Sequence, residues 1–144
     1  MSNSQNIKEI IKAEYIKCAK DPIYFLKKYA VIQHPIDGKI PFSLYDFQEK
    51  TLEDFNKHNY NIILKARQLG ISTLVAGYSL WMMTFQTDKN ILVIATKQDT
   101  AKNLVTKIRV MHANLPNWVK SSCTEDNKLS LKYVDVNDLD FLNL

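Results

Sequence analysis

The stretch Asn61-Ile-Ile-Leu-Lys-Ala-Arg-Gln-Leu-Gly-Ile-Ser-Thr73 decides how the rest of the chain is interpreted. It opens with a short run of strand-forming apolar residues, 61–65, which predicts a buried strand. Residues 66–70 predict a loop. Residues 72–85 then have a helical period, with apolar side chains at Leu74, Tyr78 and Trp81. The order strand, loop, helix indicates an α/β fold.

The next residues repeat this order. Residues 90–95 predict a second buried strand, and residues 96–113 predict a helix with an apolar stripe. Residues 129–136 alternate in polarity and are expected to form a further strand. A βαβα order gives parallel central strands in a three-layer sandwich, with ligands bound at the carboxyl ends of the strands. The Trp and Met residues of these helices are expected in the core.

Short helices are expected ahead of this unit. Apolar residues recur at helical spacing from Ile7 to Cys18, and Asp21-Pro22 supplies an N-cap followed by proline for a helix over 22–29. Residues 31–43 hold two prolines and a glycine and predict a loop. Residues 45–56 predict a third helix. We therefore expect N-terminal helices and a lead-in loop over 1–44, and an incomplete nucleotide-binding core over 45–144.

Composition sets broad limits. The 144 residues suffice for one domain, and the net charge of +4 permits a nucleic-acid partner without arguing for one. Cys18 and Cys123 have no metal-ligand spacing and are expected to be two free thiols. No apolar run approaches the ~20 residues that span a bilayer, and the N-terminus lacks a signal-peptide core. We expect an intracellular protein without a membrane partner.

The loop carries most features of a phosphate-binding loop. Such a loop needs inward backbone N–H groups, a helix that begins directly after it, a cation for phosphate charge and a hydroxyl for Mg²⁺. The usual pattern is glycine, four residues, then Gly-Lys-Ser/Thr. Gly70 and Ser72 match it, whereas Lys65 replaces the first glycine and Ile71 replaces the lysine. Taken alone, a tight strand–helix turn with a surface Arg67 explains the loop equally well.

The missing lysine needs a substitute. Arg67 is the first candidate because its planar guanidinium can hold a phosphate through two hydrogen bonds, and Lys65 is the second. The expected ATP ligands of the loop are Lys65, Arg67, Gln68, Gly70, Ile71 through its backbone, Ser72 and Thr73. Ser72 is the expected Mg²⁺ ligand. Arg67 is the one residue of the loop to which we assign a catalytic role.

A glutamine lies a dozen residues ahead of the expected strand. Its amide offers a donor and an acceptor side by side, which matches the N6 and N7 edge of adenine. An isolated glutamine on an amphipathic helix is usually just exposed. Placed before a phosphate loop, Gln48 is more simply explained as an adenine-reading residue.

Several stretches, in order, resemble the large terminase subunit of tailed phages. Residues 21–35 are similar to the lead-in of that family, and residues 40–48 to its adenine-contacting segment. Residues 65–73 are similar to its deviant Walker A loop, in which Arg-Gln-Leu-Gly is characteristic. Residues 91–107 are similar to the family's next strand and helix, and Leu115-Pro-Asn-Trp118 to the turn after them. The resemblance covers about 21–133 and implies a P-loop NTPase fold.

The resemblance also implies an activity. The family's motor hydrolyses ATP to drive double-stranded DNA into a capsid, so ATP and Mg²⁺ are the implied cofactors. Gln48 would read adenine, Gly70 would hold phosphate, and Arg67 would contact phosphate and report hydrolysis. Double-stranded DNA, the portal protein and the small terminase subunit are the implied partners. A homo-oligomeric ring would form only with the full-length protein, in the cytoplasm of an infected host cell.

One departure from the family concerns hydrolysis. A strand-end Asp for Mg²⁺ and a Glu for the attacking water are needed, and the family carries them on a later apolar strand. Asp135, Asp138 and Asp140 are preceded by no such strand, and no room remains for the family's nuclease domain. We therefore expect a truncated terminase fragment that holds half of the nucleotide site.

Two other interpretations remain open. A helicase-like ATPase also places a glutamine before its phosphate loop, but normally keeps the lysine that Ile71 replaces here. A non-catalytic module for nucleic-acid binding or assembly, with a decayed nucleotide site, accounts for the missing carboxylates. The DNA contacts are not located by the sequence. A solvated helix face explains the basic residues Lys27, Lys28, Lys102, Lys107 and Arg109.

Overall fold

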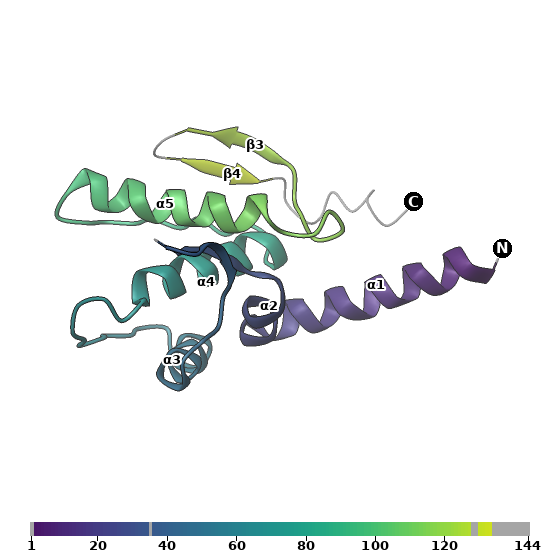
Figure 1. Cartoon of the computed structure of the whole chain (residues 1–144), viewed down its shortest axis with the longest axis horizontal. Coiled ribbons are helices and arrows are strands. Elements are labelled where there is room, and N and C mark those ends of the chain that lie inside the picture. Colours follow the sequence, from purple (N-terminus) through teal and green to yellow (C-terminus); the bar gives the residue numbers. More distant parts are fainter. Residues whose placement is uncertain (1, 35, 128–129, 134–144) are drawn as a thin grey trace.

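The chain forms a mixed α/β structure of helices and short antiparallel hairpins (Figure 1). A computed structural model describes residues 2–34, 36–127 and 130–133. The elements are α1 (Ser2–Lys20), α2 (Pro22–Tyr29), β1 (Val31–His34), β2 (Gly38–Pro41), α3 (Asp46–Lys57), α4 (Ile71–Phe85), α5 (Gln98–Ala113), β3 (Cys123–Asp126) and β4 (Leu131–Tyr133). Figure 1 shows α4 in the middle, between α5 and α3, with α1 projecting to one side.

The helices confirm the expectations from the sequence. Asp21 caps α2 as predicted, because its carboxylate accepts hydrogen bonds from the N–H groups of Ile23 and Tyr24 at 2.8 and 3.1 Å. Helices α3, α4 and α5 begin and end within two residues of the expected bounds. Helix α1 is longer than the periodic stretch that predicted it.

A core of fully buried side chains joins α1, α2, α3 and α4. Phe25, Leu26, Leu52, Leu74 and Leu80 are completely shielded from solvent. The ring of Phe25 meets that of Phe85 edge to face at 5.1 Å. The indole N–H of the buried Trp81 donates to the carbonyl of Cys18 at 2.8 Å, which ties α4 to α1. The prediction that this Trp belongs to the core is confirmed, as it is for Met111.

The expected loop over 31–43 is in fact a hairpin. Strands β1 and β2 pair antiparallel, from Val31 opposite Pro41 to His34 opposite Gly38. Gly38 has φ +71°, a left-handed conformation that glycine adopts without steric cost. Gly38 and Pro41, which help to predict a loop, here begin and end the second strand of a short hairpin.

The expected strands over 61–65 and 90–95 are absent from the described structure. Both segments run as plain tubes in Figure 1, each leading into the next helix. Their apolar side chains are exposed rather than buried: Ile62 and Leu64 are 101% exposed, Leu92 83% and Ile94 85%. A strand needs a hydrogen-bonded neighbour, and the part of the chain that the structure describes provides none. The parallel central sheet is therefore not seen.

The C-terminal strand prediction is met in part. Strand β4 lies within the expected range of 129–136 and pairs antiparallel with β3. Residues 128–129 and 134–144 lie outside the described structure, and with them Asp135, Asp138 and Asp140. Among the described helices, none has the length and apolar character needed to cross a membrane.

Candidate functional site

The loop from Ala66 to Gly70 turns directly into α4. Gln68 and Gly70 have positive φ angles of 62° and 69°, and Gly70 is the N-cap residue of the helix. The first helical hydrogen bond runs from the N–H of Leu74 to the carbonyl of Gly70 at 2.9 Å. Among the described residues, no side chain caps this end of α4. The N–H groups of the first turn are thus left for a ligand or water, as at any uncapped helix start.

Gln48 reaches the loop, but its amide is bound to backbone. Its Nε2 donates to the carbonyl of Leu69 at 3.1 Å, and its Oε1 accepts from the N–H of Tyr45 at 3.1 Å. The residue is only 2% exposed. A Cβ atom on Gly70 would lie 2.7 Å from this Nε2. Gln48 therefore braces the loop against the start of α3, a role that sequence reasoning missed.

A sequence signal for this brace was present. Gln48 is the third residue of α3, and Tyr45 is its N-cap. A glutamine in the third position commonly reaches back to the N-cap N–H, as in a capping box. The spacing therefore predicts the bond to Tyr45. The bond to Leu69 joins segments 21 residues apart and has no local signal.

The two candidate cations of the loop are exposed. Lys65 Nζ donates to the carbonyl of Ala66 at 3.2 Å. Arg67 makes no hydrogen bond or ion pair with any described residue, so its guanidinium remains available to an anion. Ile71, in the position of the usual lysine, is 8% exposed and belongs to the core. Only its backbone can face a ligand.

The hydroxyl groups expected to serve Mg²⁺ lie in the first turn of α4. Ser72 is exposed and Thr73 is half-buried. Within the described residues, no three His, Cys, Asp or Glu side chains are grouped closely enough to hold a metal ion by themselves. A divalent cation at this loop would thus need oxygen ligands from a nucleotide in addition to Ser72.

Two aromatic rings flank Gln48 on the surface. Tyr45 and Phe47 stack with ring centroids 5.7 Å apart and an interplanar angle of 8°. They are 67% and 41% exposed. The aromatic residues beside the glutamine therefore pack on each other rather than into the core, and they present a flat apolar surface at the start of α3.

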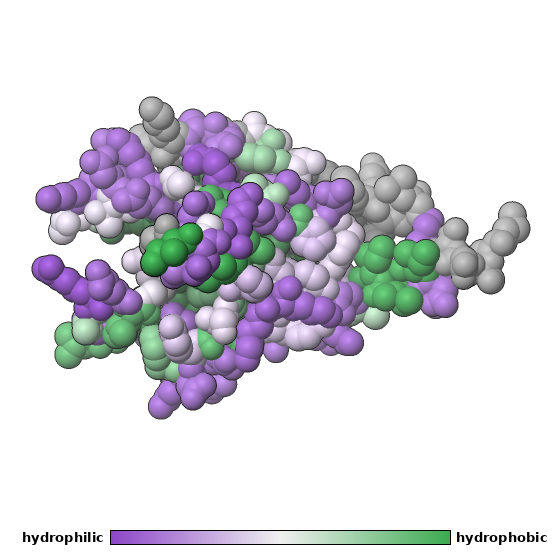
Figure 2. All heavy atoms as spheres, in the orientation of Figure 1, coloured by the Kyte–Doolittle hydropathy of each residue, from purple (hydrophilic) through white to green (hydrophobic). Residues whose placement is uncertain are grey.

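The surface beside the loop is indented. Figure 2 shows an indentation at the left margin of the molecule. In Figure 1 the loop that leads into α4 lies below the position of this indentation, and the start of α5 lies above it. The structure thus brings together Gln48, Gly70 and the start of α4, with Lys65 and Arg67 on the exposed side.

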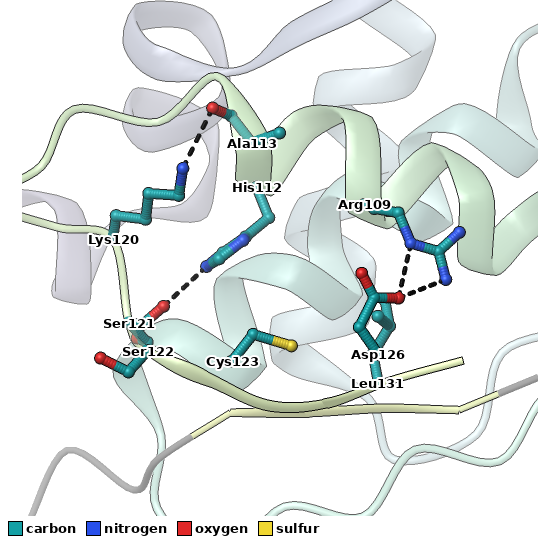
Figure 3. A pocket seen from close by; sticks show the side chains of 9 residues that line it. All are labelled: Arg109, His112, Ala113, Lys120, Ser121, Ser122, Cys123, Asp126 and Leu131. Atoms are coloured by element: carbon teal, nitrogen blue, oxygen red, sulfur yellow. Dashed lines mark hydrogen bonds and ion pairs between the residues drawn. The ribbon is translucent and has the colours of Figure 1, made fainter. Parts of the chain in front are cut away.

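A separate pocket lies between α5 and the β3–β4 hairpin (Figure 3). It has a volume of ≈ 370 Å³. Arg109 is ion-paired with Asp126, with the Nη2–Oδ1 distance at 2.6 Å, and Lys120 Nζ donates to the carbonyl of Ala113 at 3.2 Å. The Nε2 of His112 lies 2.9 Å from the carbonyl of Ser121, and burial lowers the pKa of this imidazole. The Arg109 ion pair fastens the hairpin to α5, and the contacts of His112 and Lys120 fasten the segment that leads into the hairpin.

Four of the five basic residues interpreted as solvated helix faces, all but Lys107, have a partner among the described residues. Arg109 pairs across to the hairpin, while Lys27 and Lys28 pair with Glu49 and Glu14 at 2.8 and 2.6 Å. Lys102 lies 3.4 Å from Asp99. Exposed ion pairs contribute little to stability. They do reduce the positive charge that these helix faces offer to DNA.

The chain matches no known protein-family model.

Proposed function

We propose that the chain binds the triphosphate of ATP at residues 65–73, as the ATP-binding part of a viral DNA-packaging terminase motor. One observation carries the proposal: the left-handed turn at Gly70 opens onto the uncapped first turn of α4. Consecutive N–H groups there, together with the helix dipole, favour an anion. The 15-residue α4 is long enough for its dipole to be fully developed at this end.

Arg67 takes the place of the missing lysine in this proposal. The side chain of Ile71 is buried in the core, so the charge on the terminal phosphates must be offset from elsewhere. Arg67 is exposed on the same loop and is not engaged by any described residue. Lys65 is the second candidate, because its only described contact is a carbonyl of its own loop. Ser72 completes the site by binding Mg²⁺ together with phosphate oxygens.

Gln48 has two tasks under this proposal. It holds the loop through Leu69. To read adenine as well, its amide, which is 2% exposed here, would have to become accessible to the base. A glutamine amide has two N–H donors and two acceptor lone pairs, and Gln48 uses one of each on the protein. The exposed Tyr45–Phe47 pair lies next to it and offers a ring face to the base.

The motor activity rests on the family resemblance. A parallel three-layer sandwich, double-stranded DNA as cargo, and contacts with a portal and a small terminase subunit are all part of the proposal. Hydrolysis needs strand-end carboxylates beside the loop, and the described residues place none there. ATP hydrolysis thus belongs to the proposal for the whole motor, and nucleotide binding is the step that can be tested on this chain by itself.

Titration of a fluorescent ATP analogue with Mg²⁺ tests the site. We expect saturable binding to the wild type and a Kd that rises roughly ten- to a hundredfold in Arg67→Ala, because a charge-assisted phosphate contact contributes ~1.5–3 kcal/mol. Arg109→Ala is the matched control. Arg109 is engaged by Asp126 on the hairpin, so its loss should leave the Kd unchanged.

The result can go against the proposal in two ways. Equal affinity in the wild type and Arg67→Ala would remove Arg67 from the phosphate role. No binding of the analogue by the wild type at millimolar concentration would refute the nucleotide site. The non-catalytic module for nucleic-acid binding or assembly would then be the better interpretation.

A further inference from the structure

The two ends of the buried Gln48 amide are both bound to backbone. The side chain is 2% exposed, and a buried amide is costly unless its donor and acceptor are satisfied. Its Oε1 accepts from the N–H of Tyr45 at 3.1 Å, and its Nε2 donates to the carbonyl of Leu69 at 3.1 Å. The first partner is a donor and the second an acceptor, so the amide fits in one orientation only.

This contact determines which way one peptide group of the loop faces. The Leu69–Gly70 peptide is trans, so its carbonyl and its N–H point in opposite directions. The carbonyl points at the buried Gln48 amide. The N–H of Gly70 therefore points away from that amide, and within the described part of the chain it makes no hydrogen bond. It directly precedes the free N–H groups in the first turn of α4.

The glycine at this position makes the contact possible and also makes the peptide group free to turn over. A Cβ on Gly70 would lie 2.7 Å from Nε2 of Gln48, closer than real Cβ contacts come. Glycine adopts either sign of φ without steric cost, so Gly70 by itself does not hold its φ of +69°. The Gln48 amide supplies the contact that selects one orientation of the peptide group.

We propose that Gln48 is a positioning residue for phosphate: by holding the carbonyl of Leu69, it keeps the N–H of Gly70 directed at the anion bound ahead of α4. The inference rests on the proposed nucleotide site and specifies what sets its affinity. Without the Gln48 contact, the peptide group can turn over and present its carbonyl oxygen to the phosphates. An oxygen in that place repels the anion, whereas the N–H donates to it.

Positioning and adenine reading differ in the ligands they affect. A contact with adenine strengthens the binding of ligands that carry adenine and no others. An oriented N–H at the phosphates strengthens the binding of ATP and of inorganic tripolyphosphate by the same factor. Measuring both ligands, each with Mg²⁺, therefore separates the two roles of Gln48.

Glycine amides provide a direct readout, because the chain has 3 glycines, at positions 38, 70 and 77. Labelling with ¹⁵N-glycine gives one backbone signal for each, and Gly70→Ala identifies the signal of Gly70 by its loss. In the wild type we expect this signal to move downfield as either ligand is added, because the N–H becomes hydrogen-bonded to phosphate. Gly38 has a similar left-handed φ in the β1–β2 hairpin, and its signal should stay in place.

Gln48→Met removes both hydrogen bonds of the amide and keeps a side chain of similar length. We expect its Kd for ATP and for tripolyphosphate to rise by the same factor, roughly tenfold, and the downfield movement of the Gly70 signal to be lost. Unchanged signals of Gly38 and Gly77 show that the variant is folded. Gln33→Met, at an exposed glutamine of β1, is the matched control and should bind both ligands as the wild type does.

The wild type and the variant can each overturn the proposal. A Gly70 signal that stays in place while tripolyphosphate displaces the fluorescent ATP analogue from the wild type would show that this N–H does not face phosphate. Equal tripolyphosphate affinity in the wild type and Gln48→Met would remove the positioning role, and a loss confined to ATP would assign Gln48 to the base. In all these cases the wild type still binds, so the nucleotide site stands. Absence of any binding by the wild type refutes the site, and this inference with it.

Discussion

The helical body and the left margin of the molecule use similar apolar residues in opposite ways. In the body, Leu26, Leu74 and Leu80 are completely buried where α2 and α4 meet. At the margin, Ile62 and Leu64 are as exposed as side chains of an isolated residue. Figure 2 shows hydrophobic surface at this margin, where Figure 1 places the segment before the loop.

The difference teaches what each kind of element needs. A helix satisfies its backbone by itself and only has to lay one face on a neighbour. A strand has to find its hydrogen-bond partner elsewhere in the chain or in another chain. The apolar runs at 61–65 and 90–95 have the composition of strands, but among the described residues they have no such partner.

The largest effect is expected from shortening a leucine in each region. Leu26→Ala should lower the free energy of unfolding by about 2–5 kcal/mol, because the side chain is fully buried and its removal leaves a cavity. Leu64→Ala should change it by less than about 0.5 kcal/mol, because this side chain has no packing to lose. Urea denaturation followed by circular dichroism measures both.

Both variants are measured at the same low protein concentration. A cost above about 1 kcal/mol for Leu64→Ala would show that the margin is packed in solution and would break the comparison. A cost below about 1 kcal/mol for Leu26→Ala would contradict the tight packing of α2 on α4. That packing is close: a Cβ on Gly77 of α4 would lie 2.8 Å from Leu26.

The helices were predictable because their signals are local. Asp21 followed by Pro22 marks the start of α2, and the apolar period marks α4 and α5. The strands were not predictable in the same way. An apolar run predicts burial, yet burial depends on neighbours that the run does not encode. The β1–β2 hairpin was missed because Pro35 and Pro41 suggest a loop.

The candidate site was predictable in position but not in contacts. The sequence placed Gln48 and the loop at 65–73 in one site, and the structure puts the Gln48 amide 3.1 Å from the carbonyl of Leu69. That the amide faces protein rather than open space depends on how α3 packs on α4. The burial of Ile71 results from the same packing, because this residue begins the helix on its core side.

A smaller effect is expected at two glycines, one in the β1–β2 hairpin and one in the loop before α4. Gly38 and Gly70 both have left-handed φ angles, +71° and +69°. Gly38→Ala should lower the free energy of unfolding by about 1–2 kcal/mol, the cost of a left-handed backbone at alanine. No clash adds to this cost, because a Cβ there meets no atom within 4 Å. Gly70→Ala should cost about 2–3 kcal/mol, since its Cβ would also displace the Gln48 amide and break a hydrogen bond of ~1 kcal/mol.

A double variant isolates the contribution of the Gln48 hydrogen bond to the cost of Gly70→Ala. In a Gln48→Ala background, the cost of Gly70→Ala should fall to that of Gly38→Ala, because no amide remains to be displaced. Thermal unfolding monitored by circular dichroism is sufficient for the comparison. Equal costs at the two glycines in the wild type would show that the brace does not hold in solution.

The smallest effect is expected inside the helical body, at a carboxylate on α1. Glu14 accepts hydrogen bonds from Lys28, Tyr24 and Tyr29 at 2.6, 2.6 and 2.7 Å. These hydrogen bonds lower the pKa of its carboxyl group from 4.5 to about 2. A depressed folded pKa stabilises the protein above the unfolded pKa, and this contribution is lost as the pH falls from about 4.5 to about 2.

Glu14→Gln should therefore be less stable than the wild type at pH 6, and the gap should close as the pH falls toward about 2. Urea denaturation at pH 6, 4 and 3 measures it. Glu9→Gln, an exposed residue of the same helix, should be as stable as the wild type at all three pH values. A gap that stays constant between pH 6 and pH 3 would mean that the ionised carboxylate is not what the three donors stabilise. The contact would then matter only for how α1 packs on α2.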